Sequence, residues 1–398
     1  MSAHTFAVRR FSPEKSTFGK LFARDSLVRR MDWILLLATV LLCAIGTMLV
    51  YSATRNRTAL THGDHYYFLI RHVMNAGIGF ALAAGVMAIG HHRMRSVVPF
   101  FYALAILGIL AVLSPLGSTV NGAHSWIVIG GGFSLQPSEF VKVAIIIGMA
   151  MVLSARVDAG DRIHPDNRTV LQALGLAVVP ILIIMLMPDL GSIMVLAAII
   201  LGALLASGSD NRWVFGLMLA GVAGSLTVWK LGILSKYQVD RFAAFANPAL
   251  DPSGVGYNTS QARIAIGSGG LLGKGLFHGS QTTGQFVPEQ QTDFVFSVAG
   301  EELGFVGAAF IIALIGVILW RACAIARSAT DLYGTIVAAG VVAWFAFQSF
   351  ENIGMTLGIM PVAGIPLPFV SYGGSSMFAN CIAIGMLQSV RMHRPMSA

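Results

Sequence analysis

Apolar segments about 20 residues long recur along this chain, and they constrain its fold more than any other feature. A helix of that length with few charges can cross the hydrocarbon core of a bilayer. About ten such segments begin, in order, near Trp33, Leu69, Val97, Phe140, Leu171, Leu190, Trp213, Phe294, Leu332 and Met377. We therefore predict an all-α membrane protein built as a bundle of about ten transmembrane helices.

Composition excludes a water-soluble fold, because 56% of the 398 residues are hydrophobic and only 11% are charged. The cysteines Cys43, Cys323 and Cys381 stand singly inside apolar segments, so they indicate neither a zinc site nor a disulfide framework. The net charge is +8, but the basic residues cluster beside apolar segments, where topology and anionic membrane lipids explain them. We expect no nucleic-acid partner.

Basic residues in the short connections predict the orientation. Each crossing takes the chain to the other side of the membrane. The basic segment 1–30 therefore lies on the same side as the connections that follow every second crossing. These connections hold Arg93, Arg156, Arg212, Arg321 and Arg391. That side is predicted to be the cytoplasm. Residues 31–391 then form one membrane domain between cytoplasmic tails at 1–30 and 392–398.

The longest connection, about residues 233–293, is predicted to be a large structured extracellular loop between the seventh and eighth crossings. Residues Tyr257–Ile266 mix aromatic, polar and branched side chains as a short surface helix would. Arg241 and Arg263 are candidate ligands for an anion such as a diphosphate. A solvated loop face explains each of them equally well.

A carboxylate stands at the outer mouth of the apolar segment that begins at Phe294. Partial burial there would raise the pKa of Asp293 and make it a better base, and ionisable residues at membrane depth are candidates for function. Alternatively, Thr292 and Asp293 cap the helix that follows. The residues alone leave cap and catalyst equally open.

A second candidate site opens the segment that follows Gln136. Pro137 and Ser138 favour a helix start, and Glu139 and Lys142 would then share one face and neutralise each other. A purely structural ion pair is possible, but a pair lining a wet cavity beside a substrate is favoured.

Two further segments complete the candidate outer site. Asp189 lies in a tight hairpin between two apolar segments, where a plain turn residue is the strong alternative. The stretch 361–376 is too rich in Pro and Gly for a regular helix, and we expect it to form a wall of the site. Ser375, near the end of this stretch, is a candidate substrate-binding residue.

These motifs resemble, in order and spacing, the signature of the SEDS family, which includes RodA, FtsW and SpoVE. They are Gln-Pro-Ser-Glu with Lys at 136–142, Pro-Asp-Leu-Gly at 188–191, Asn-Pro to Gly-Tyr-Asn at 247–258, Ile-Ala-Ile-Gly-Ser-Gly-Gly-Leu at 264–271, Thr-Asp-Phe to Gly-Glu-Glu-Leu-Gly at 292–304, and 364–376. Six motifs in fixed order are very specific, and the match extends over roughly 31–391. The resemblance implies a peptidoglycan glycosyltransferase that polymerises lipid II at the outer membrane face, with a class B penicillin-binding protein as its transpeptidase partner.

The resemblance also implies that Asp293 is the catalytic aspartate, with Glu139, Lys142 and Asp189 near it. Asp293 would deprotonate the 4-hydroxyl of incoming lipid II as it attacks an undecaprenyl-diphosphate-linked donor, so the enzyme would be an inverting glycosyltransferase. Lys142, with a loop arginine or a divalent cation (Mg or Mn), would stabilise the departing diphosphate. A lipid II flippase is the rival from another class; the one-sided site and the absence of a detectable inverted repeat weigh against it.

Two details separate this chain from others in the family. Many members carry Arg before Trp in the segment 121–127, where this chain has Ser125, so a phosphate contact made by that Arg cannot be transferred. The sequence Phe286–Gln291 and the short C-terminal tail resemble the elongation-type RodA more than the division-type FtsW. They predict a role in cell-wall elongation and cell shape.

Overall fold

The computed structural model describes residues 30–57, 63–120, 123–130, 133–187, 189–232, 239, 241, 245 and 254–393. Most of both predicted tails and much of the first part of the predicted outer loop, including the motif residues 247–252, lie outside these ranges.

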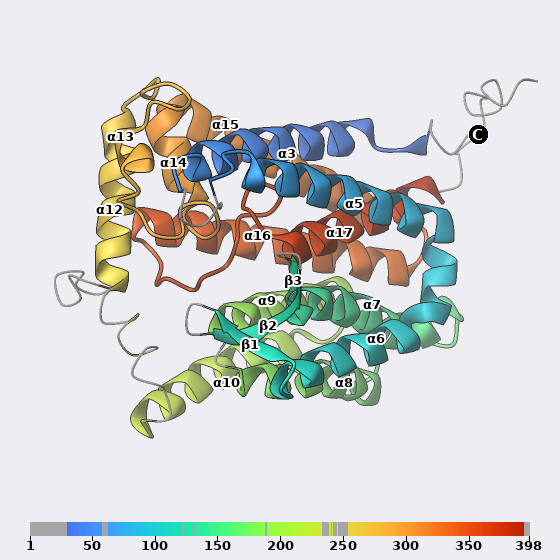
Figure 1. Cartoon of the computed structure of the whole chain (residues 1–398). Helices are drawn as coiled ribbons and strands as arrows, with labels where there is room; N and C mark the ends of the chain where they lie inside the picture. Colours follow the sequence, from blue (N-terminus) through green and yellow to red (C-terminus); the bar gives the residue numbers. More distant parts are fainter. Residues whose placement is uncertain are drawn as a thin grey trace, which may run out of the picture.

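The predicted helical bundle is confirmed (Figure 1). Within the described residues, its ten long helices are α3 (Trp33–Thr54), α5 (Tyr67–Ile89), α6 (His91–Leu113), α7 (Pro137–Asp158), α8 (Asn167–Met185), α9 (Leu190–Ala206), α10 (Asn211–Lys230), α15 (Gly304–Ser328), α16 (Leu332–Leu357) and α17 (Gly374–Met392). Eight of the ten are long and apolar enough to cross a membrane, whereas α9 has 17 residues and α17 falls outside that set.

Helices α7 and α16 lie at the centre of the bundle and α10 lies at its edge. In an apolar 18-residue window of each helix, 67% of the α7 window and 61% of the α16 window are buried, against 6% of the α10 window. Small residues bring other helices close: a Cβ added at Gly385 of α17 would lie 2.7 Å from the carbonyl oxygen of Ala83 in α5. The central pair can therefore hold polar side chains away from lipid.

The sequence predicts one continuous helix that begins near Phe294, and this prediction is wrong. The segment divides into α14 (Val295–Glu302) and α15, and Gly304, the first residue of α15, has φ +66°. The first N–H groups of α15, at Phe305 and Val306, donate to the carbonyls of Gly270 and Leu271 and not to α14. A Cβ at Gly304 would lie 2.2 Å from the Gly273 nitrogen, so the break requires glycine.

Helices α12 (Val255–Gly269), α13 (Ser280–Thr283) and α14 gather at one end of the bundle, which we call the loop end (Figure 1). The predicted surface helix over 257–266 is confirmed by α12. It packs through Ala262 and Ala265 against Phe294 and Met355. The opposite end, where α3 begins and α15 and α17 finish, we call the terminal end.

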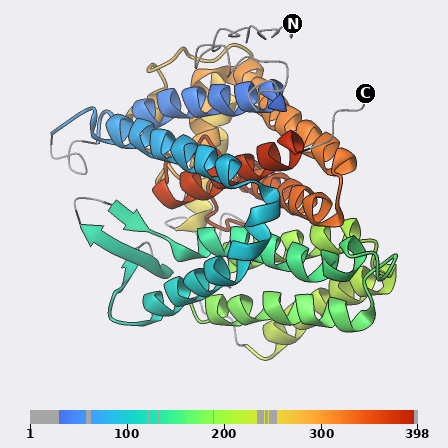
Figure 2. The same cartoon turned by 90° about the vertical axis from the view of Figure 1, so that its right-hand side faces the viewer.

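A small antiparallel sheet projects from the side of the bundle (Figure 2), and it was not predicted from the sequence. Its strands are β1 (Gly117–Val120), β2 (Ala123–Gly130) and β3 (Phe133–Leu135), in the order β1-β2-β3. Ser125 in β2 is 2% exposed and faces protein. Because β3 runs directly into Gln136, the sheet fixes where α7 begins.

Candidate active site

Asp293 lies in a tight turn that precedes α14. The carbonyl oxygen of Glu289 accepts hydrogen bonds from the N–H groups of Thr292 (3.1 Å), Asp293 (3.1 Å) and Phe294 (3.2 Å). The N-cap residue of α14 is Phe294, and no side chain in the described part of the chain caps it. The capping alternative for Asp293 is therefore wrong, and its carboxylate is left for other contacts.

Two other segments hold this turn in place. The Asn352 side chain of α16 donates from Nδ2 to the carbonyls of Asp293 (2.8 Å) and Ile365 (2.7 Å). Ser371 Oγ donates to the carbonyl of Thr292 (2.5 Å). The irregular stretch before α17 thus packs directly against the Asp293 turn, as expected for a wall of the site. Only its last three residues, 374–376, are helical and open α17.

The surroundings of Asp293 raise its pKa to about 7. Burial is the main cause; the charge of Glu289 adds to it, the Arg241 guanidinium opposes it, and Asp189 adds a smaller increase. A Cβ at Gly364 would lie 3.5 Å from Asp293 Oδ2 and 3.7 Å from Arg241 Nη2, so the glycine sits directly beside both groups. Asp293 as a residue is only partly buried, and a carboxylate of this pKa is suited to accept a proton near neutral pH.

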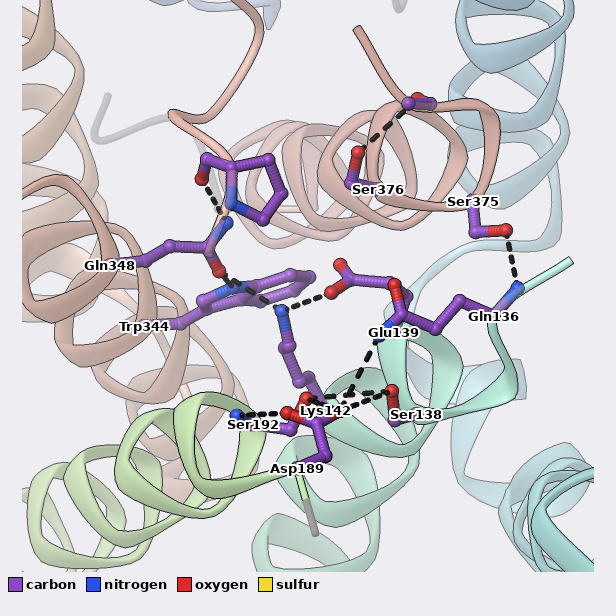
Figure 3. Close-up of polar contacts among 12 residues, drawn as sticks. Gln136, Ser138, Glu139, Lys142, Asp189, Ser192, Trp344, Gln348, Ser375 and Ser376 are labelled. Atoms are coloured by element: carbon purple, nitrogen blue, oxygen red, sulfur yellow. Dashed lines mark hydrogen bonds and ion pairs between the residues drawn. The ribbon is translucent and has the colours of Figure 1, made fainter. Parts of the chain in front are cut away.

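The predicted pair of Glu139 and Lys142 is an ion pair (Figure 3). Lys142 Nζ donates to Glu139 Oε1 (2.7 Å) and Gln348 Oε1 (3.0 Å), and it lies 5.2 Å from the centroid of the Trp344 ring. Gln348 also donates from Nε2 to the carbonyl of Pro366 (2.7 Å). Both charges are buried, so the pair joins α7, α16 and the wall of the site behind the accessible surface.

Asp189 caps α9 and also reaches the start of α7. Its side chain accepts hydrogen bonds from the Ser192 N–H (3.0 Å) and hydroxyl (2.7 Å), and Gln136 Nε2 lies 3.4 Å from Oδ2. The main-chain N–H of Gln136 in turn donates to Ser375 Oγ (2.8 Å). The N-termini of α7, α9 and α17 therefore meet at one place (Figure 3).

The structure separates the two candidate arginines. Arg241 lies beside Asp293, whereas Arg263 is exposed on α12, with its Cδ 3.2 Å from the Cβ position of Gly358 at the end of α16. The described residues contain no group of three or more His, Cys, Asp or Glu side chains that could hold a metal ion.

Three residues that position the site were not predicted from the sequence: Glu289, Gln348 and Asn352. Gln348 and Asn352 are buried polar residues four apart in α16, so both lie on one face of this helix. That spacing was a usable signal. No sequence signal indicates the role of the Glu289 carbonyl, because that role depends on the shape of the turn.

Comparison with known proteins gives a consistent result over the whole bundle. The family model described as "Cell cycle protein", which joins FtsW, RodA and SpoVE, matches residues 32–396. The chain is 37% identical over 360 residues to stage V sporulation protein E of Bacillus subtilis (strain 168), covering 90% of this chain and 96% of that one. It is 36% identical over 360 residues to a probable peptidoglycan glycosyltransferase FtsW of Trichlorobacter lovleyi, covering 90% and 92%.

Solved structures show the same architecture. A chain from work on the structural coordination of polymerization and crosslinking by a peptidoglycan synthase complex superposes with a TM-score of 0.76 at 27% identity, covering 92% of this chain and 99% of that one. The rod shape determining protein RodA of Thermus thermophilus superposes with a TM-score of 0.67 at 27% identity, covering 92% and 98%.

Proposed function

Because the chain belongs to the FtsW, RodA and SpoVE family, we propose that it is a peptidoglycan glycosyltransferase that polymerises lipid II at the outer face of the cytoplasmic membrane. One observation carries the catalytic assignment: Asp293 is held in a fixed turn, partly accessible, with a pKa of about 7. The name of the FtsW relative supports the reaction class. In this proposal the loop end faces outward and both termini lie in the cytoplasm.

Asp293 acts as the single general base. It takes the proton from the 4-hydroxyl of the acceptor sugar as that oxygen attacks the anomeric carbon of the donor with inversion. The bond from that carbon to the diphosphate breaks, and the diphosphate leaves with the electron pair as a stable anion. No acid is needed to protonate it, whereas most glycoside hydrolases require a second carboxylate.

Arg241 stabilises the departing diphosphate, because its guanidinium lies beside the Asp293 carboxylate. Lys142 is fully buried and already bonded to Glu139 and Gln348. It supports the reaction through the wall of the site, which differs from the direct contact expected from the sequence.

The proposed partner is a class B penicillin-binding protein, since one solved neighbour comes from a complex that polymerises and crosslinks. The elongation role predicted from Phe286–Gln291 stays a prediction. The two relatives reported at 36% and 37% identity carry FtsW and sporulation names, which supports a division or sporulation role instead. Depletion of the protein in its host distinguishes the roles: rounded cells indicate elongation, filaments indicate division, and a defect confined to spores indicates sporulation.

Purified protein with purified lipid II, alone and with its class B partner, tests the proposal on a glycan-length gel. We expect long glycans from the wild type and a rate lower by about 10²- to 10⁴-fold for Asp293→Asn. Thermal unfolding is the control: burial disfavours the ionised carboxylate, so the variant should be at least as stable at pH 8. Equal rates would refute the catalytic assignment. The flippase would be established if Asp293→Asn still flips lipid II in vesicles and neither the wild type nor the variant makes any glycan.

A further inference from the structure

Glu289 has a backbone conformation that side-chain-bearing residues rarely adopt. Its φ is +51°, in the left-handed region that favours glycine. Such strain persists where the surroundings impose it, and it gathers at functional sites. Here it turns the Glu289 carbonyl inward, where that one oxygen accepts the N–H groups of Thr292, Asp293 and Phe294. The conformation of Glu289 thus sets the position of Asp293.

The Glu289 side chain folds back over the same turn. Its Oε2 accepts hydrogen bonds from Thr292 Oγ1 (3.2 Å) and Gln291 Nε2 (3.3 Å). These contacts keep a negative charge within the turn that carries Asp293. A partly buried like charge so near disfavours ionisation of Asp293.

We propose that Glu289 is a positioning residue for Asp293: its carbonyl fixes the turn, and its negative side chain sets the pH range in which Asp293 accepts a proton. The inference rests on the proposed function. Among the described residues, the charged groups that face Asp293 are Glu289, Arg241 and Asp189, and Arg57 faces Glu289. Of the two carboxylates that face Asp293, Glu289 has the larger effect on its pKa.

The test is the pH profile of lipid II polymerisation by Glu289→Gln, a substitution that removes the charge and keeps the size and the hydrogen-bonding capacity. Without the neighbouring charge Asp293 stays ionised at lower pH, so the pH of half-maximal rate should fall by roughly one unit. The plateau rate at high pH should also fall, because a less basic Asp293 is a weaker base. Asp64→Asn is the matched control, since Asp64 is an exposed carboxylate bonded to the Tyr66 N–H, and it should leave the profile unchanged.

A second variant keeps the test decisive if Glu289→Gln folds poorly. Glu289→Gly suits a φ of +51° and keeps the carbonyl, so it should fold and show the same shift to lower pH. Gln285→Gly relieves a similar φ of +57° and should leave the profile unmoved. A wild-type profile in the Glu289 variants would overturn the inference. Wild-type activity in Asp293→Asn would instead overturn the proposed function, so the two failures are distinguishable.

Discussion

The two ends of the bundle use the same kinds of charged side chain in different ways. At the terminal end, Asp32 accepts hydrogen bonds from Arg321 Nε (2.9 and 3.1 Å), and Gln388 exchanges two hydrogen bonds of 2.8 Å with the Asp32 main chain. Asp158 accepts the Leu332 N–H (2.8 Å) and pairs with Arg95. Each carboxylate is matched by a cation and by N–H donors, so these networks join helices.

Around Asp293 the charges do not balance. Asp293 faces two other carboxylates and one guanidinium, and Glu139 Oε2 has no hydrogen-bond partner among the described residues. Matched networks stabilise a fold, whereas an unbalanced group keeps its capacity to bind a proton or a ligand. The comparison teaches that a charged residue beside an apolar segment can either join helices or bind a proton or ligand. Its partners in the fold decide which of the two it does.

Breaking the buried pair should have the largest effect on stability. Lys142→Met leaves the Glu139 carboxylate buried without its cation, and we expect a loss of about 3–5 kcal/mol in the free energy of unfolding. Thermal unfolding in detergent measures it. The double variant Glu139→Gln with Lys142→Met should recover most of the loss. A single variant as stable as the wild type would show that the pair contributes nothing.

Removing a charge at the terminal end should lower stability without affecting catalysis. Asp32→Asn weakens the contact with Arg321, which is 20% exposed, and the expected loss is about 1–3 kcal/mol with an unchanged polymerisation rate. Asp210→Asn is the control, because its pair with Arg212 is exposed and should change stability by less than about 0.5 kcal/mol. A fall in rate that exceeds the loss of folded protein would contradict the division between the two ends.

Acidification should separate activity from stability at Asp293. As the proposed base, Asp293 must be ionised, so the rate should fall by about 10-fold per pH unit below its pKa of about 7. The folded pKa lies above the unfolded value, so the folded state binds this proton more tightly, and the Asp293 contribution to stability rises as pH falls from 7. Rate and melting temperature measured together between pH 8 and pH 6 check this; a rate independent of pH would contradict it.

The smallest change in stability is expected at a carboxyl group that takes part in no hydrogen-bond or ion-pair network among the described residues. Glu351 in α16 is fully buried, and neither of its oxygens has a hydrogen-bond partner among the described residues. Glu351→Met should therefore be neutral or stabilising by up to about 1 kcal/mol, with normal polymerisation. A clear loss of stability would mean that Glu351 takes part in a matched network.

Sequence reasoning succeeded where the signal was local. Long apolar segments located the helices, and the three-residue spacing of Glu139 and Lys142 predicted their contact. It failed where distant packing decides: Arg241 and Arg263 lie in the same kind of polar loop, yet only Arg241 faces Asp293. The break at Gly304 was missed although Glu301 and Glu302 lie just before it, because its shape depends on packing against residues 270–273. In the sheet, β1 and β3 have only four and three residues and show no pattern of their own.

The break at Gly304 has a mechanical consequence. Because α15 starts its own hydrogen-bond ladder on Gly270 and Leu271, a change in its tilt is not carried along a continuous helix into α14. Membranes differ in thickness, and long spans adapt to them by tilting. The break therefore leaves no continuous helix through which a tilt of the 25-residue α15 would reach α14 and the turn that carries Asp293.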